Sequence, residues 1–385
     1  MKWADFCIIS ITIIFSILLE GCSLRESRDP FDPAFAAASA LNPRQSLGKE
    51  IFFDTSLSEP AGQACGSCHD PSVAFTTPKN RMSSGITPGV ISSRSGMRNA
   101  PTASYAAFSP IPFFDGEAGT WVGGQFLDQR ADDLEEQAGG PPLNGVEMAN
   151  PSKAAVVAKL RAAPYASRFR TIFGADIFDD TERAYRSMTQ LIADYQRSSE
   201  VSPFSSKYDA YLSNRALLTA QELKGLSLFR DPAKGNCEAC HPSRGDAPLF
   251  TDFTNDNIGV MKNPTNPFYA MPVGINPDGA LFIDRGLGGS PKINDSQFDG
   301  RFKVPTLRNV ARTFPYMHNG VFQDLRDVVR FYNTVCAPGN PDGWDPPEVA
   351  ETQNCSELGD LHLADDEIDA IVAFLRTLND GYIQR

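Results

Sequence analysis

The sequence predicts a mainly α-helical protein of two similar domains with long irregular loops. The motif Cys-X-X-Cys-His occurs twice, at residues 65–69 and 237–241. A helical pattern precedes each copy, and a long segment rich in Gly, Pro, Ser and Asn follows each. Because the same order of helix, motif and irregular segment recurs, the chain carries an internal duplication.

Each copy of the motif predicts a covalently bound haem c. Two thiols at this spacing bond the two vinyl groups of one haem, and the adjacent histidine ligates the iron. A redox disulfide or half of a zinc site also uses Cys-X-X-Cys, but neither needs a histidine directly after the second cysteine. The predicted attachment and ligand residues are Cys65, Cys68, His69, Cys237, Cys240 and His241.

The helix before each motif shows the same spacing of glycine and apolar residues in both halves. The first helix is expected around residues 45–53. In the second copy, Thr219 and Glu222 form a capping box, and residues 225–229 repeat the glycine and apolar spacing of residues 48–52. The two halves therefore start from the same structural unit.

Helical periodicity also predicts core helices elsewhere in both halves. These helices are expected at residues 152–162, 181–197 and 364–378. The serine-rich segment 198–206, which contains a proline, is the best domain boundary. We therefore expect an N-terminal haem domain at residues 42–200 and a C-terminal haem domain at residues 201–385.

The length and charge limit the kinds of partner. At 385 residues the chain accommodates two domains of ordinary size, and its 41% hydrophobic content supports a packed core. A net charge of −12 at pH 7 argues against a nucleic-acid partner, because phosphate binding needs clustered Lys and Arg. A small substrate or a protein partner fits this composition better.

The N-terminal segment predicts export. Residues 1–21 form a signal peptide whose apolar run is too short for an ordinary membrane span. The run ends in a sequence that resembles a lipobox, with Glu20 in place of the usual small residue and Cys22 as the lipidated new N-terminus. Residues 22–41 would form a tether. We expect a periplasmic protein anchored by lipid to the outer membrane, or, as the alternative, one that is cleaved and released.

Two cysteines remain after the others are assigned. Of eight cysteines, one lies in the signal peptide, one is Cys22 and four belong to the haem motifs, which leaves Cys336 and Cys355. In an oxidising compartment these two are expected to form a disulfide, which would contribute about 3 kcal/mol through loop closure. A catalytic thiol is the alternative.

Two further sequences complete a family resemblance. Residues 98–102 read Arg-Asn-Ala-Pro-Thr after the first motif, and residues 302–309 read Phe-Lys-Val-Pro-Thr-Leu-Arg-Asn after the second. With the spacing of the haem motifs, they make residues 42–382 resemble the bacterial di-haem cytochrome c peroxidase superfamily, which includes the MauG proteins. The resemblance implies a peroxide-reacting haem in the N-terminal domain and a six-coordinate, electron-handling haem in the C-terminal domain.

The resemblance also implies a distal pocket on the first haem. Gln137 would be its hydrogen-bond donor, Pro141 part of its wall, and Glu147 the acid/base that moves a proton between the peroxide oxygens. The alternative is that Glu147 is an ordinary surface carboxylate of a loop.

The positions of the histidines predict that the iron of the first haem has no distal protein ligand. No histidine lies between His69 and His241, so the distal histidine of classical family members has no counterpart here. Met82, Met97 and Met148 are the residues that would close the site instead, although methionine more often fills gaps in a core.

On the second haem, Tyr332 is the expected distal ligand. It lies fourteen residues after His318, where cytochrome c peroxidases place methionine and MauG proteins place tyrosine. A phenolate stabilises ferric and higher oxidation states, so this haem would store oxidising equivalents. Met317 is the rival ligand, and a buried tyrosine without a ligand role is the second alternative. His318 is expected to hydrogen-bond near the haems, and His362 to be exposed.

The family also binds calcium between the domains. By resemblance the ligands would be the side chain of Asn99 and the carbonyl groups of Thr313 and Pro315, which suit a hard cation.

Two tryptophans of the family are missing here. Leu127 stands where an inter-haem tryptophan is usual, ten residues before Gln137, and Gly235 stands where MauG has a surface tryptophan. Trp121 would replace the inter-haem tryptophan only if its loop folded back toward the haems. Trp344 has no evident route by which it could pass electrons to a haem. The sequence therefore does not indicate which residue would couple the two haems electronically.

These observations leave three functional hypotheses. The first is a MauG-like enzyme that uses hydrogen peroxide to oxidise an external donor, such as a side chain of a secreted protein. The second is peroxide detoxification with electrons from a small cytochrome c or copper protein. The third is a non-enzymatic electron carrier, which would need saturated ligation at both irons.

Overall fold

The computed structural model describes residues 40–383. Residues 1–21, Cys22 and nearly all of the tether, for which we predict export and lipid anchoring, lie outside the described residues. Within the described part of the chain, no helix is long and apolar enough to cross a membrane.

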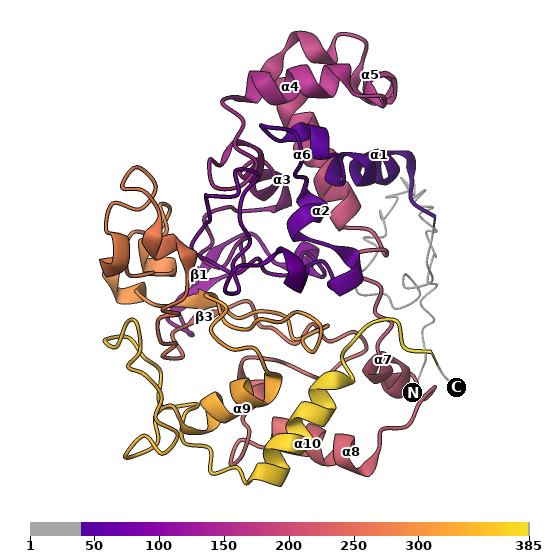
Figure 1. The fold of residues 1–385 in the computed structure, drawn as a ribbon. Helices are drawn as coiled ribbons and strands as arrows, with labels where there is room; N and C mark the ends of the chain where they lie inside the picture. The colour runs from indigo at the N-terminus through magenta and orange to yellow at the C-terminus, as the bar shows by residue number, and fades with distance from the viewer. Residues whose placement is uncertain (1–39, 384–385) are drawn as a thin grey trace, which may run out of the picture.

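The protein is rich in helices and has few strands, as the sequence predicts (Figure 1). The helices of the first half are α1 (Pro43–Phe52), α2 (Cys65–Cys68), α3 (Leu134–Ala138), α4 (Lys153–Ala162), α5 (Ala166–Phe173) and α6 (Thr181–Gln196). Those of the second half are α7 (Lys207–Leu212), α8 (Ala220–Arg230), α9 (Leu325–Thr334) and α10 (Asp365–Arg376). In the described part of the chain the strands are β1 (Phe113–Asp115), β2 (Thr120–Val122), β3 (Asn255–Asp256) and β4 (Phe302–Lys303).

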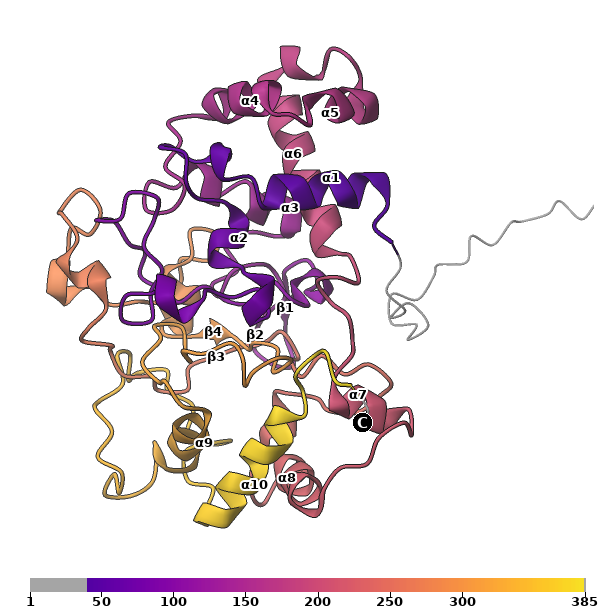
Figure 2. The same ribbon diagram turned by 45° about the vertical axis from the view of Figure 1, so that its right-hand side comes forward.

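Each half has its own hydrophobic core. The buried residues of one core all fall between Leu47 and Val201, and those of the largest core in the second half fall between Tyr208 and Leu378. Figures 1 and 2 show α1–α6 gathered at one end of the molecule and α7–α10 at the other, with the strands between them. The strands form two small antiparallel pairs, β1 with β2 and β3 with β4. No sequence pattern predicts the hairpin β1–β2, which lies in a segment expected to be irregular.

The two helices that precede the haem motifs begin at side-chain caps. Asn42 caps α1 and Thr219 caps α8, and in each helix the third residue returns a hydrogen bond to the cap backbone. These reciprocal bonds satisfy amides that a helix start otherwise leaves unpaired. The expected capping box of Thr219 and Glu222 is therefore confirmed.

The duplication predicted from the sequence is visible in the packing. The helix α1 packs on α6, and α8 packs on α10. Gly48 of α1 lies so close to α6 that a Cβ atom would meet the Leu191 carbonyl oxygen at 1.9 Å, and Gly225 of α8 meets the Ala370 carbonyl oxygen of α10 at the same 1.9 Å. The two glycines allow the same close helix crossing in both halves.

Adding a methyl group at either crossing should destabilise the protein. We expect Gly48→Ala and Gly225→Ala each to lower the free energy of unfolding by about 1–3 kcal/mol, because the backbone helices have to move apart. Gly274→Ala is the matched control, since no atom lies within 4 Å of its added Cβ. Urea denaturation of the three variants measures the difference. Equal stability of all three would contradict the proposed role of the crossings.

Candidate functional site

Both motif histidines are held in the orientation that iron ligation needs. The Nδ1 atom of His69 donates to the Phe75 carbonyl oxygen at 3.1 Å, and that of His241 donates to the Phe250 carbonyl oxygen at 2.8 Å. These bonds leave Nε2 of each ring available as a ligand. Burial lowers the pKa of His69 and lowers that of His241 to about 4. Both imidazoles are therefore neutral, which is the form that binds a metal.

The sequence Arg-Asn-Ala-Pro-Thr braces the first histidine. Thr76 donates to the Ala100 carbonyl oxygen at 2.9 Å, and Thr102 donates to the Ala74 carbonyl oxygen at 2.6 Å. These two bonds hold the segment that contains Phe75, whose carbonyl group orients the histidine. The role of this short sequence is thus structural support of His69, the expected haem ligand.

The second copy uses the same device. Thr251 donates to the Val304 carbonyl oxygen at 2.7 Å, and Thr306 donates to the Leu249 carbonyl oxygen at 2.6 Å. These two bonds hold the segment that contains Phe250, just as the bonds of Thr76 and Thr102 hold the segment that contains Phe75. No pattern in the sequence singles out these threonines, although one threonine directly follows each of the two phenylalanines.

A cavity of about 340 Å³ adjoins the second motif, and we call it the second haem cavity. Its wall includes Cys237, Cys240, His241 and Tyr332. Both motif thiols are free, so they are available to bond a haem. The residues of this cavity therefore fit a covalently attached haem c.

Tyr332 and its rival Met317 both line the second haem cavity. Tyr332 lies on α9, where burial raises the pKa of its hydroxyl group and the nearby Cys240 and Cys237 raise it further. An isolated phenol in this place keeps its proton, and it loses the proton when a metal cation binds its oxygen. The structure thus brings the expected distal ligand to the cavity that holds His241.

A buried lysine provides a further sign of an anionic ligand in this cavity. Lys303 lines the cavity, and its ammonium group donates to the Gly124 carbonyl oxygen and to the Ser109 hydroxyl group, neither of which is charged. Burial lowers the pKa of Lys303 to about 8, and the Asp128 carboxylate opposes that shift. A carboxylate of a bound haem would supply the missing counter-charge.

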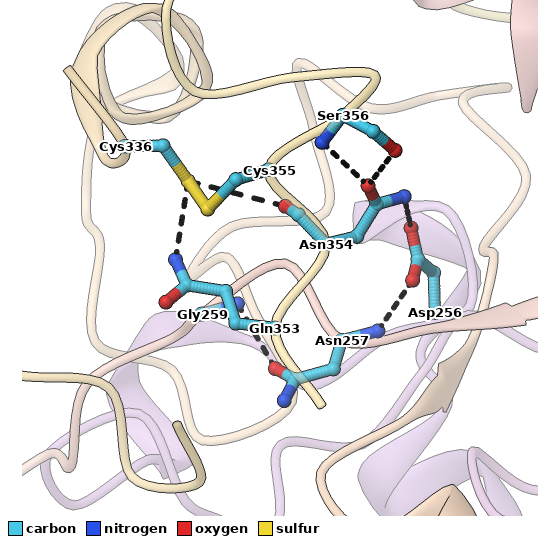
Figure 3. The surroundings of a disulfide bond; sticks show 8 residues. All are labelled: Asp256, Asn257, Gly259, Cys336, Gln353, Asn354, Cys355 and Ser356. Atoms are coloured by element: carbon cyan, nitrogen blue, oxygen red, sulfur yellow. Dashed lines mark hydrogen bonds between the residues drawn. A yellow bond between two sulfur atoms is a disulfide. The ribbon is translucent and has the colours of Figure 1, made fainter. Parts of the chain in front are cut away.

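The disulfide between Cys336 and Cys355 is formed, and it lies beside the end of α9 (Figure 3). The Cys336 amide donates to the Gly359 carbonyl oxygen, and the Gly359 amide donates to the Tyr332 carbonyl oxygen at 2.7 Å. On the other side, Asn354 donates to the Asp256 carboxylate at 2.7 Å. The disulfide loop therefore fastens the helix that carries Tyr332 to a wall of the second haem cavity.

The residues expected in the first distal pocket lie in one folded segment. The Gly140 amide donates to the Gln137 carbonyl oxygen at 3.1 Å, and the Met148 amide donates to the Pro141 carbonyl oxygen at 3.2 Å. These bonds bring Glu147 back toward Gln137. Met148 packs in the hydrophobic core of the first half, which is the role we considered most common for methionine.

Glu147 is partly buried next to the first haem motif. Burial raises the pKa of its carboxyl group, against the opposing effects of Arg130 and Asn144. Burial and the nearby Glu147 carboxylate in turn raise the pKa of the Cys65 and Cys68 thiols to about 12. A carboxyl group with a raised pKa beside a haem attachment site is suited to proton transfer.

Asn99 and Pro315, two of the expected calcium ligands, are in contact. The Asn99 side-chain nitrogen donates to the Pro315 carbonyl oxygen at 2.6 Å, while its side-chain oxygen is buried without a partner. Rotating this side-chain amide by 180° would exchange its nitrogen and oxygen atoms. The Asn99 oxygen and the Pro315 carbonyl oxygen would then face the same point. Thr313 also lines the second haem cavity with these two residues. This set of amide and carbonyl oxygens suits a hard cation.

The region between the two halves contains a buried ionic cluster. The Arg98 guanidinium contacts the Asp128 and Asp284 carboxylates, each at 2.7 Å. Phe302 lies beneath this guanidinium and stacks on His318 at a centroid distance of 3.8 Å.

Leu127 and Gly235, which stand in place of the two family tryptophans, both line the second haem cavity. The remaining histidine, His362, is exposed as expected.

Comparisons with known proteins agree with these features. A family model described as di-haem cytochrome c peroxidase matches residues 42–216. The methylamine utilization protein MauG of Paracoccus denitrificans is 42% identical, over 95% of this chain and 93% of its own. Cytochrome c551 peroxidase of Nitrosomonas europaea is 28% identical, over 96% of this chain and 89% of its own. The crystal structure of the di-haem peroxidase BthA of Burkholderia thailandensis superimposes with a TM-score of 0.79 at 36% identity, over 91% of this chain and 89% of that one.

Proposed function

Because this chain belongs to the di-haem cytochrome c peroxidase and MauG family, we propose that it uses hydrogen peroxide at its first haem to oxidise an external donor. The observation that carries the MauG-like form of this proposal is Tyr332, which lines the same cavity as His241. Methionine in its place would favour a haem that accepts electrons from a mild donor, whereas tyrosine favours a haem that holds oxidising equivalents.

The two halves divide the work. We assign residues 42–200 to a peroxide-reacting domain with His69 as iron ligand, and residues 201–385 to a domain whose iron is held by His241 and Tyr332. When bound, the haems supply the iron that takes up peroxide and the capacity to give up electrons. Calcium held by Asn99, Thr313 and Pro315 would fix the position of the two halves. We place the mature protein in the periplasm, bound to the outer membrane through a lipid on Cys22.

The first pocket provides the proton chemistry. Glu147 takes a proton from the inner oxygen of hydrogen peroxide and returns it to the outer oxygen, which then leaves as water. Gln137 donates a hydrogen bond to the oxygen on which negative charge develops, and Pro141 limits the space beside it. Burial raises the pKa of Glu147, which makes its carboxylate a stronger base in the first step and lets it hold the proton until the second step.

Spectroscopy of the oxidised holoprotein tests this proposal. We expect electron paramagnetic resonance and resonance Raman spectra of one high-spin and one low-spin haem, because only the second iron has two protein ligands. Two low-spin haems would overturn the open first site and would favour an electron carrier.

Replacing the tyrosine ligand tests the second site. We expect Tyr332→Met to raise the reduction potential of the low-spin haem by about 0.1 V or more, because axial ligands span a range of roughly 0.8 V. Potentiometric titration followed by absorbance measures the shift. Met317→Leu is the matched control and should leave the potential unchanged. A shift in the control but not in Tyr332→Met would assign the ligand to Met317.

A second candidate function is peroxide detoxification with a small redox protein as donor. The absence of tryptophan at both positions favours it, because in the family the tryptophan at the position of Leu127 couples the two haems and, in MauG proteins, the one at the position of Gly235 draws electrons from a protein substrate. Steady turnover of peroxide with reduced cytochrome c would support detoxification. Modification of a side chain on a co-encoded secreted protein would support the MauG-like function.

A further inference from the structure

The β1–β2 hairpin lies between the two helical halves (Figure 2), and two of its phenylalanine side chains are exposed. We call Ile111, Phe113, Phe114, Glu117 and Trp121 the hairpin surface. The first three side chains are 60%, 48% and 50% exposed. Trp121 lies opposite Phe114 in the strand register, with ring centroids 5.8 Å apart. Clustered exposed aromatic side chains are typical of a protein–protein interface.

The hairpin is hydrogen-bonded to a strand that borders the second haem cavity. The side-chain nitrogen of Asn255 donates to the Trp121 carbonyl oxygen at 2.8 Å, and the Gly123 amide donates to the Phe253 carbonyl oxygen at 2.9 Å. Phe253 lines the second haem cavity, as does Asp256, the residue after Asn255. One hydrogen bond and one residue therefore separate the backbone of Trp121 from the wall of this cavity.

The charged residues of the hairpin itself are all acidic. No Lys or Arg occurs between Arg98 and Arg130, whereas Asp115 ends β1 and Glu117 lies in the hairpin turn. Arg301 lies nearby, but its guanidinium packs over Phe298, which in turn contacts Phe114. An apolar surface next to carboxylates is complementary to a partner face that is apolar at its centre and basic at its rim.

We propose that the hairpin surface docks a small electron-donor protein with such a basic rim, and that its electrons enter through Trp121. This inference rests on the second candidate function, peroxide detoxification with a small redox protein as donor, and it names the surface that such a donor would use. Reduction of one hydrogen peroxide to two waters consumes two protons and two electrons, so two donor molecules each lose one electron. The indole of Trp121 is the most easily oxidised side chain of the hairpin surface, and it would pass the electrons one at a time toward the second haem cavity. Trp121 would then carry the electrons that the family tryptophans carry, which leucine and glycine at Leu127 and Gly235 are unable to do.

Binding of mitochondrial cytochrome c, a small basic haem protein, tests the docking surface. Calorimetry of the holoprotein at low salt should give a dissociation constant that rises about tenfold in Glu117→Lys and in Phe113→Ser, because each removes part of the complementarity. The matched controls are Asp246→Lys and Leu217→Ser, which alter an exposed carboxylate and an exposed apolar side chain outside the hairpin. Unchanged binding in both hairpin variants, or equal weakening in the controls, would overturn the proposal.

Trp121→Phe separates electron entry from docking. Phenylalanine keeps a ring against Phe114, so the dissociation constant should change by less than about twofold, while oxidation of bound reduced cytochrome c by peroxide-treated holoprotein should slow by about tenfold or more. An unchanged rate would overturn the role of Trp121. A holoprotein that fails to consume peroxide even with ascorbate as donor would refute the proposed function itself. A holoprotein that consumes peroxide with ascorbate but whose cytochrome c binding ignores the hairpin would refute only the docking surface.

Discussion

Glu147→Gln is expected to slow the reaction of the oxidised holoprotein with hydrogen peroxide by about 10²–10⁴-fold, the usual contribution of a positioned acid/base. Glutamine keeps the size and polarity of the side chain but is unable to take up or release the proton. Stopped-flow absorbance of the first haem measures the rate. Spectra of both haems before peroxide is added should match those of the wild-type protein, which shows that the site is intact.

The pH dependence of the same reaction identifies Glu147 further. Burial raises the pKa of this carboxyl group above its ordinary value of 4.5. Below the raised pKa the group is protonated and is unable to accept the proton of peroxide, so the wild-type rate should fall as the pH is lowered through that value. Glu147→Gln should lack this fall, and Glu351→Gln, in an exposed loop, should keep it. A wild-type fall that persists in Glu147→Gln would assign the proton transfer to another group.

Arg98→Met is expected to lower the free energy of unfolding by about 3–5 kcal/mol, because it leaves the buried Asp284 carboxylate without its arginine partner and leaves Asp128 with Arg130 alone. The side chain of Arg98 is 11% exposed and those of Asp128 and Asp284 are 7% exposed. Chemical denaturation of the holoprotein measures the loss. Arg44→Met is the matched control, since its ion pair with Asp194 is 40% and 27% exposed and should contribute less than about 1 kcal/mol. Equal losses in the two variants would contradict the special role of the buried cluster.

The acid sensitivity of the protein should change in the same variant. Burial alone would raise the pKa of Asp284, but the Arg98 guanidinium reverses this effect and lowers the pKa to about 2. A carboxyl group with a lowered pKa in the folded state stabilises the protein above its ordinary pKa of 3.8. That stability is lost as the pH falls from this value toward 2, and Arg98→Met should lack this part of the acid transition.

Local features of the chain made much of the architecture predictable. A haem c motif is a covalent requirement that five adjacent residues satisfy, so residues 65–69 and 237–241 are recognisable without a structure. Helix periodicity and capping are also local, and the predicted helices 152–162 and 181–197 match α4 and α6 to within one residue at each end. The segment between the first motif and α3 was less predictable, because its hairpin and short helical turns depend on contacts with the second half.

The sequence by itself therefore determined the two haem motifs, their helices and the identity of the candidate ligand Tyr332. Only the tertiary structure decided what surrounds them. Arg98 and Asp284 are 186 residues apart in the chain, and no local pattern predicts their contact. The position of Trp121 beside the strand that borders the second haem cavity depends on the same kind of long-range pairing. Covalent attachment and helix formation are set by neighbours in sequence, whereas charge pairing, burial and routes for electrons are set by neighbours in space.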